Sequence, residues 1–179
     1  MKTLIRKLLK EQEEILTLPP FHYFDNDWNL VLELSEGKPF KILGDVNLSN
    51  NQEITTLGNC YAVGGNLYLF GCKNIQSLGN LTEVGGDLNL RYCTNLQSLG
   101  KLTEVGGWLI LYDCKNLQSL GNLTEVGDSL NLAECLFLQS LGNLTEVGGY
   151  LDLENTPIAK TMTKNEIRQQ VNVGGNIYL

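Results

Sequence analysis

The sequence predicts a mainly β, single-domain fold: a right-handed β-solenoid of 21-residue coils whose short strands stack into parallel β-sheets. A 21-residue phrase occurs five times, and so short a period holds one coil and leaves no room for two helices. Within each copy Leu alternates with other residues, as in a strand that buries one face. The 179 residues, 42% of them hydrophobic, are enough for one continuous core. The copies start at Thr56, Ser77, Ser98, Ser119 and Ser140.

Residues 1–39 are expected to form an N-terminal helix and a capping segment. Apolar residues between Thr3 and Leu16 recur at helical spacing, which predicts a short amphipathic helix that ends before Pro19. The aromatic stretch over residues 21–28 is expected to cover the open core of the first coil. The segment Trp28–Leu34 alternates as an edge strand does.

The repeat solenoid is expected over residues 40–179, with regular coils over 56–155. Each coil carries Gly-Gly-x-Leu-x-Leu, in which both Leu side chains face the core and their neighbours face outward. We expect the glycine pair to supply backbone conformations that are closed to other residues. The inward pairs are Val46/Leu48, Leu67/Leu69, Leu88/Leu90, Leu109/Leu111, Leu130/Leu132, Leu151/Leu153 and Ile177/Leu179.

The period breaks after Asn155, where a helical insertion is expected over about residues 158–171. The sequence from Thr163 to Glu166 has the form of a capping box, so we expect a short helix over residues 164–170. The frame returns in a last rung at 174–179. Because soluble proteins cover unpaired apolar edges, we expect either this helix to act as a lid or a homodimer to form through the C-terminal edge.

The segment Leu88-Asn-Leu-Arg-Tyr-Cys-Thr-Asn-Leu96 resembles the leucine-rich repeat family, whose coils read Leu-x-Leu-x-x-(Asn/Cys)-x-x-Leu. The Val-Gly-Gly-x-Leu-x-Leu phrasing is similar to receptor L-domain-like coils and to repeats of bacterial and phage proteins. The resemblance covers about residues 40–179 and implies a leucine-rich-repeat-like β-solenoid. The coils depart from many members because they are too short for a convex helix, and no cysteine-rich cap is recognisable. The resemblance implies little about activity.

Charge and cysteine usage exclude several classes of partner. The net charge of −7, with only 13 Lys and Arg, argues against nucleic-acid binding through phosphates. Lys7 and Lys10 interrupt the apolar start before a secretory signal can form, and no segment approaches transmembrane length. Five Cys without a signal indicate reduced thiols. We therefore expect a cytoplasmic protein with no membrane partner.

Four of the five Cys occupy one column of the repeat. Side chains on a straight ladder cannot surround an ion tetrahedrally, and parallel neighbours are poorly placed for a disulfide. A buried thiol otherwise behaves as a small apolar group. We therefore predict a structural role with no metal and no cofactor, and a core position for Cys60. The column consists of Cys72, Cys93, Cys114 and Cys135.

An acidic stripe forms a second column, which consists of Glu83, Glu104, Glu125 and Glu146. Carboxylates one strand spacing apart repel each other and would not be tolerated inside the core, so we expect a solvated stripe. The alternative is an acidic strip that attracts a basic partner or imitates nucleic-acid phosphate.

The outward positions of the Gly-Gly-x-Leu-x-Leu strands differ between coils, whereas the rest of the repeat agrees. Variation on one face of a regular scaffold favours partner recognition, and exposed aromatic patches typically mark interaction sites. The alternatives are that β-rich faces merely favour aromatic residues, or that a terminal segment folds over them. The predicted partner-binding residues are Trp108, Ile110, Tyr112, Tyr68, Phe70, Tyr150, Arg91 and Asp152.

These observations predict a non-enzymatic protein–protein interaction module, in style a bacterial or phage effector or inhibitor. His22, the single His, lies outside the repeats, and a flat sheet offers no cleft in which carboxylates could acquire catalytic pKa values. Two alternatives stay open. Aromatic residues among Asn and Asp also suit a carbohydrate-binding surface, and the acidic stripe suits a nucleic-acid mimic that blocks a host protein.

Overall fold

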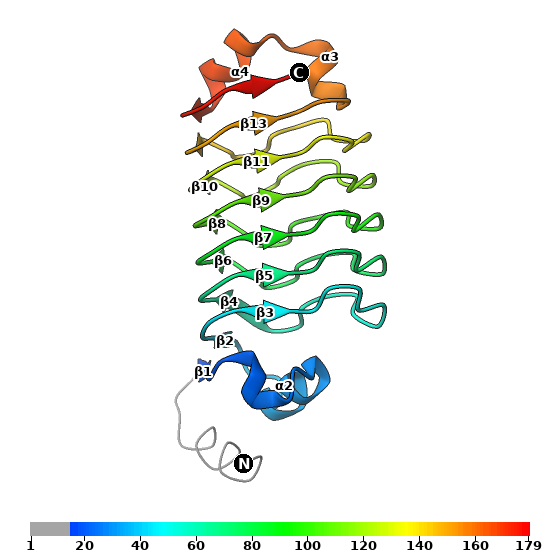
Figure 1. The fold of residues 1–179 in the computed structure, drawn as a ribbon, viewed down its shortest axis with the longest axis vertical. Coiled ribbons are helices and arrows are strands. Elements are labelled where there is room, and N and C mark those ends of the chain that lie inside the picture. Colours follow the sequence, from blue (N-terminus) through cyan, green and yellow to red (C-terminus); the bar gives the residue numbers. More distant parts are fainter. Residues whose placement is uncertain (1–14) are drawn as a thin grey trace.

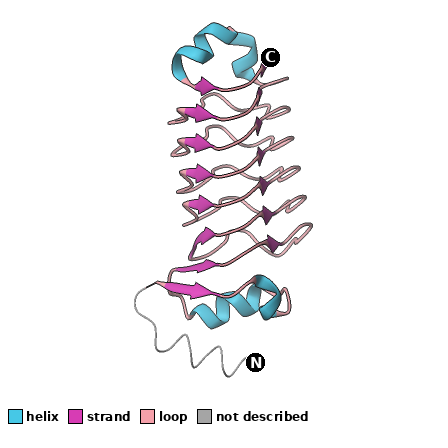
Figure 2. Ribbon diagram, turned by 60° about the vertical axis from the view of Figure 1, so that its left-hand side comes forward, coloured by secondary structure: helices cyan, strands magenta, loops and turns pink. Residues whose placement is uncertain are grey.

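A computed structural model describes residues 15–179 and shows a parallel β-solenoid of stacked coils (Figure 1). The predicted fold class is confirmed: the protein is mainly β, with about 21 residues per coil and a few short helices. Each regular coil contributes one strand to an eight-stranded sheet, sheet A, and one to a seven-stranded sheet, sheet B. Figure 2 shows the two sheets as separate columns along the length of the molecule.

The strands of each sheet and the helices are given below in chain order. Sheet A contains β1 (Leu16–Leu18), β2 (Phe40–Ile42), β4 (Cys60–Val63), β6 (Glu83–Val84), β8 (Glu104–Val105), β10 (Glu125–Val126), β12 (Glu146–Val147) and β14 (Asn172–Val173). Sheet B contains β3 (Val46–Asn47), β5 (Leu67–Tyr68), β7 (Leu88–Asn89), β9 (Leu109–Ile110), β11 (Leu130–Asn131), β13 (Leu151–Asp152) and β15 (Ile177–Tyr178). The helices are η1 (Phe21–Phe24), α2 (Trp28–Ser35), α3 (Pro157–Thr161) and α4 (Lys164–Gln170).

Equivalent residues of successive coils pair in register, so the core is one continuous column. Leu88 of β7 pairs with Leu67 on one side and with Leu109 on the other. The inward Leu, Val and Cys positions of the regular coils are almost completely buried. Each coil therefore buries its apolar residues against its neighbours, as stacking of single coils requires.

The glycine pair is needed for space and not for conformation, which corrects the expectation drawn from the sequence. Gly85 is not among the glycines with positive φ, whereas Gly79, in the Leu-Gly-Asn turn, has φ +65°. A Cβ on Gly85 would lie 2.6 Å from the carbonyl oxygen of Gly64, and one on Gly106 would lie still closer to that of Gly85. Successive coils therefore touch backbone to backbone at this corner.

The N-terminal part differs from the expectation in two places. The segment expected as an edge strand is helix α2, because the side chain of Asp27 caps it by accepting from the backbone N–H groups of Asn29 (2.9 Å) and Leu30 (3.4 Å). Trp28 and Val31 then face the core at helical spacing.

Sheet A begins before residue 40, because β1 pairs in parallel with β2. Leu16, at the end of the helix expected over residues 3–16, lies in β1, and residues 3–14 lie outside the described part. The aromatic rings of Phe21 and Phe40 each lie 6.0 Å from that of Trp28, so aromatic side chains cover this end of the core.

At the C-terminal end two helices replace the usual turn, as Figure 1 shows. The expected helix is α4, and its capping box is formed between Thr163 and Glu166. Helix α3 is additional, and Thr156, which occupies the cysteine column, caps it. Ile158 and Ile167 bury their side chains against the core. The period then resumes, and β15 pairs with β13. Of the expected inward pair only Ile177 is buried, whereas Leu179, the last residue, is 38% exposed, which corrects the prediction. A homodimer through this edge stays a prediction.

Among residues 15–179, no helix is long and apolar enough to cross a membrane.

Substitution Gly106→Ala should lower the free energy of unfolding by about 1–3 kcal/mol, the usual cost of forcing atoms into a packed site. Its Cβ would press on the Gly85 carbonyl oxygen, which belongs to the backbone and cannot swing away. Urea unfolding measures the change. Asp128→Ala is the control, since a Cβ already exists at that neighbouring glycine-pair position, and a similar loss in both variants would contradict the prediction.

Candidate functional site

The outer face of sheet B carries the predicted partner-binding residues in three columns. The first column precedes the Leu-x-Leu segment, the second is its middle residue, and the third follows it. Most coils place short polar side chains in the first two columns. These side chains accept hydrogen bonds from backbone N–H groups.

In the first column a hydrogen-bond ladder joins successive coils. Oδ1 of Asp45 accepts from the N–H of Asn66 (2.7 Å), Oδ1 of Asn66 accepts from that of Asp87 (2.7 Å), and Oδ1 of Asp87 accepts from that of Trp108 (2.8 Å). The ladder resumes where Oγ of Ser129 accepts from the N–H of Tyr150 (3.1 Å). Asp, Asn or Ser is therefore the residue that the fold uses here.

Trp108 interrupts this ladder because its side chain has no acceptor for the next coil. The interruption explains an irregularity of the sequence, in which Asp128 replaces the second glycine of the pair. At the equivalent Gly107, a Cβ would collide with Oδ1 of Asp87. In the next coil Trp108 takes the place of Asp87. Because Trp108 has no Oδ1, the Cβ of Asp128 meets no such atom and is tolerated. Tyr150 interrupts the ladder in the same way before Asn176.

The second column repeats the pattern within single coils. Oδ1 of Asn89 accepts from the N–H of Arg91 (3.1 Å), and Oδ1 of Asn131 accepts from that of Ala133 (3.1 Å). Such bonds from a side chain to the backbone two residues on stabilise turns. Ile110 and Tyr68 occupy this column without an acceptor close to the backbone. The large residues of this face thus stand where the scaffold elsewhere uses polar side chains.

Two aromatic rows run along the solenoid axis. In the first row, Tyr92 packs edge-to-face against Phe70 (5.5 Å between ring centroids) and Tyr112 (5.6 Å). In the second row, Tyr150 packs in the same way against Trp108 (5.6 Å) and Tyr178 (5.8 Å).

Trp108 and Tyr150 meet although a whole coil separates them. The intervening Ser129 is small and only 3% exposed, so both rings lie above it. Trp108 itself remains 39% exposed. The C-terminal segment therefore does not cover it.

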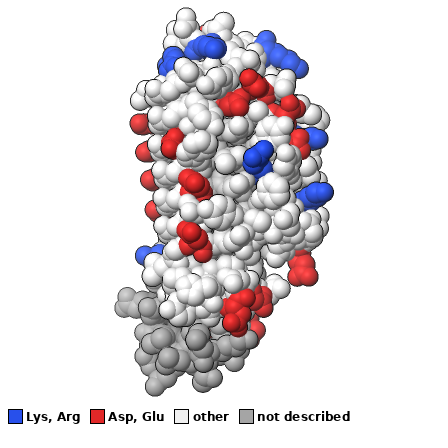
Figure 3. Space-filling view, viewed as in Figure 1, with Lys and Arg blue, Asp and Glu red and all other residues white. Residues whose placement is uncertain are grey.

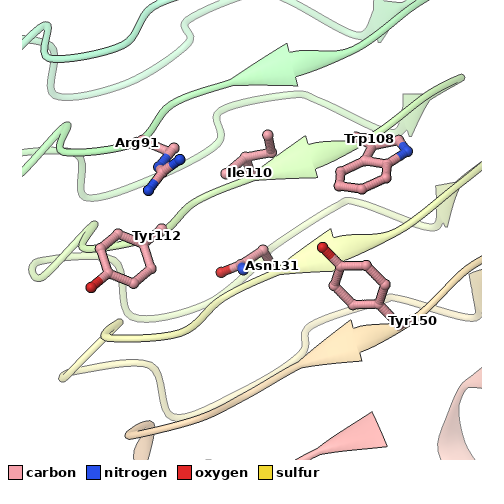
Figure 4. Close-up of a pocket in the computed structure, with 6 residues that line it drawn as sticks. All are labelled: Arg91, Trp108, Ile110, Tyr112, Asn131 and Tyr150. Carbon is pink, nitrogen blue, oxygen red and sulfur yellow. The ribbon is translucent and has the colours of Figure 1, made fainter. Parts of the chain in front are cut away.

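A shallow hollow of about 150 Å³ lies between the two rows (Figure 4). Ala133, 5% exposed, and Ser129 belong to the same coil, so this coil is recessed between two coils with larger outward residues. The sequence-predicted residues meet here in part, whereas Phe70, Tyr68 and Asp152 lie outside its lining. The lining residues are Arg91, Trp108, Ile110, Tyr112, Asn131 and Tyr150.

Burial, and then the nearby carboxylate of Asp152, raise the pKa of Tyr150 above its ordinary value. A phenol is protonated at neutral pH even at its ordinary pKa of about 10, so that of Tyr150 can donate a hydrogen bond, and the shift extends this to higher pH. Asp152 itself accepts from the side-chain amide of Asn131 (3.1 Å).

Sequence reasoning missed Tyr92 and Asn131. Tyr92 adopts φ +62°, at a position where other coils place Asn50, Gly71 or Asp113, residues that suit this conformation. The available signal was one Tyr in a column that otherwise holds Asn, Gly, Asp and Glu. Asn131 gave no signal, since Asn is ordinary in its column.

The acidic stripe lies on sheet A, where Glu104 pairs in register with Glu83 and with Glu125, and Glu125 pairs with Glu146. All four side chains are exposed, and a row of acidic side chains follows the left edge of Figure 3. The stripe and the aromatic rows therefore occupy different sheets. Whether the stripe has a function stays a prediction.

The cysteine column lies inside the core and bonds successive coils. Sγ of Cys93 donates to the carbonyl oxygen of Leu69 (3.1 Å), and Sγ of Cys114 donates to that of Leu90 (3.1 Å). All five Cys are buried and free. Within residues 15–179, no cluster of three His, Cys, Asp or Glu side chains could hold a metal ion.

Comparison of the chain with protein-family models, curated proteins and solved structures found no match.

Stability should fall as the pH rises from about 9 to about 12. Burial raises the pKa of Cys93 and Cys135 to about 12, whereas unfolded thiols titrate near 8.5. Between these values the unfolded chain loses protons that the folded chain keeps, so the free energy of unfolding decreases with pH. Urea unfolding at several pH values, with Cys93→Ala/Cys135→Ala as the matched variant, measures this. An equal slope in both proteins would contradict it.

Trp108→Asn and Asp128→Gly should be coupled. Alone, Trp108→Asn brings its Oδ1 against the Cβ of Asp128, whereas the double variant restores both the ladder and the glycine pair. We expect the double variant to be more stable than the sum of the single changes by about 1 kcal/mol, a typical coupling for contacting residues. A double-mutant cycle in urea measures it, and additive effects would show that Trp108 and Asp128 are independent.

Proposed function

We propose that this protein is a non-enzymatic module that binds a partner protein through the outer face of sheet B. One observation carries the proposal: large apolar and aromatic side chains stand at positions where the repeat otherwise uses backbone-bonding polar residues. At Trp108 and Tyr150 this substitution costs the ladder a hydrogen bond. The ring contacts that replace the lost hydrogen bond are worth about as much as the bond itself, about 1 kcal/mol, so the solenoid gains little from the exchange. A partner is therefore the best reason for it.

The geometry also suits a protein interface. Edge-to-face packing fixes Trp108 and Tyr150 before a partner arrives, which reduces the entropy lost on binding. Trp, Tyr and Arg dominate the energetics of protein interfaces, and a cluster of such residues around a small hollow is typical of their centres. The acidic stripe on sheet A would contribute to orientation and association rate through its field.

A carbohydrate-binding surface is the second candidate. Asn131 and Asp152 form a hydrogen-bonded pair beside the rings of Trp108 and Tyr150, and polar groups beside exposed rings also suit sugars. The third candidate, an acidic mimic of nucleic acid, draws support from the in-register Glu column. Strong weakening by salt would favour the mimic over both alternatives.

We also propose a repeat family for the coils. The Leu-x-Leu-x-x-Cys pattern and its buried, carbonyl-bonded thiols support a leucine-rich-repeat-like solenoid of bacterial or phage style. Five free thiols support a reducing compartment, which we take to be the cytoplasm.

Trp108→Ala should abolish capture of the partner from an extract of the native host while lowering the free energy of unfolding by about 1 kcal/mol, the typical value of an aromatic pair. Capture is followed by mass spectrometry and repeated with the purified partner. Phe137→Ala is the control, because this ring is 57% exposed but lies outside both aromatic rows. Equal capture by both variants would contradict the proposal, and a glycan bound only by the Trp108 form would favour the second candidate.

A further inference from the structure

Arg91 is held over two tyrosine rings. Its guanidinium carbon lies 5.6 Å from the ring centroid of Tyr92 and 5.2 Å from that of Tyr112. Within the described residues, its Nε is buried and has no hydrogen-bond partner. Buried donors in folded proteins are ordinarily paired, so the contacts that hold this guanidinium are those with the two rings and not a hydrogen bond of its Nε.

The position of the guanidinium is fixed in advance. Tyr92 and Tyr112 also pack against each other, and Tyr92 holds its ring there by adopting a left-handed backbone conformation. Stacking on aromatic rings leaves the planar edge of a guanidinium, with its fork of N–H groups, free to bind a carboxylate through two parallel hydrogen bonds.

Two carboxylates adjoin lining residues of the hollow, Asp113 next to Tyr112 in sequence and Asp152 on the side chain of Asn131, and both are engaged elsewhere. Asp113 forms an ion pair with Lys115 (3.3 Å), and Asp152 accepts from Asn131 (3.1 Å) and from the N–H of Glu154 (3.0 Å). Among residues 15–179, the ion pair of Asp113 is made with Lys115 and not with Arg91.

The rest of the hollow offers further donors. The Asn131 amide carries two protons, of which one is donated to Asp152, and its Oδ1 already accepts from the N–H of Ala133. In Figure 4 the hydroxyl of Tyr150 points toward the space beside Asn131, whereas that of Tyr112 points away. Ile110 supplies an apolar wall. Such a lining selects a group rich in acceptors at the end of a short apolar stem.

The size of the hollow limits the ligand. At about 150 Å³ it is smaller than the ~300–1,000 Å³ of pockets that take drug-sized molecules, so it suits a single side chain.

We propose that the hollow binds the carboxylate of one acidic side chain of the partner protein, with Arg91 as the charged donor and Asn131 and Tyr150 as neutral donors. The inference rests on the proposed function, because it names the chemistry that the same face recognises.

The experiment uses the isolated protein and capped amino acids as probes. N-acetyl-glutamate amide is titrated into ¹⁵N-labelled protein, and the Nε–H signal of Arg91 and the indole N–H signal of Trp108 are followed by NMR. We expect a saturable shift of the Arg91 signal that N-acetyl-glutamine amide does not produce. In Arg91→Gln, followed through Trp108, binding should weaken about tenfold or more, as loss of a charge-assisted hydrogen bond implies. Lys101→Gln should bind as the unaltered protein does.

Every result of this titration either supports or overturns the proposed carboxylate site. Absence of a saturable shift, equal shifts with both probes, or equal binding by Arg91→Gln would overturn the proposal. Tighter binding of inorganic phosphate than of the capped glutamate would assign the hollow to a phosphorylated group and overturn the carboxylate assignment. If the titration fails while capture of the partner still depends on Trp108, the inference falls and the proposed function stands.

Discussion

Backbone contact between successive coils at the glycine corners is the constraint on which the rest of the structure depends. Where Gly106 lies against Gly85, a single methyl group would not fit, so the coils stack at one spacing and in one register. Every residue type is then repeated directly above itself. A column can hold only side chains that tolerate their own kind as neighbours, and each column meets this condition differently.

The Glu column, the Cys column and the first outward column of sheet B meet this condition in three ways. Glu residues stack only where water screens them, as on the outer face of sheet A. Thiols stack inside the core because each, like Cys93, donates to a carbonyl of the preceding coil. Asp and Asn in the first outward column accept from the next coil, as Asp45 does from Asn66. The repeat is thus a set of hydrogen-bonded columns as much as a row of strands.

Periodicity made the coil predictable, because a strict 21-residue repeat leaves few ways to bury the Leu residues. The segment from Trp28 to Ser35 could not be assigned from its pattern, since its apolar residues fit both a strand and a helix. The cap at Asp27 decided between them. The role of the glycine pair was misjudged because a sequence does not reveal how closely two coils approach.

The candidate site was predictable where it departs from the repeat. Trp108 and Tyr150 stand out against Asp, Asn and Ser at the same position. The recess between the rows was not predictable, because it follows from the small size of Ser129 and Ala133, and small residues attract no notice in a sequence. The exchange of Gly for Asp128 was visible but had no meaning until the ladder explained it.

The interrupted ladder also has a mechanical consequence. In a stack held together by nearest-neighbour contacts, the joint between the Trp108 coil and the Ser129 coil has lost one cross-link, as has the joint after Tyr150. Both joints lie beneath the second aromatic row. A ligand that touches Trp108 and Tyr150 together would contact the coils on both sides of the first joint, so its binding would stiffen the solenoid where this cross-link is missing.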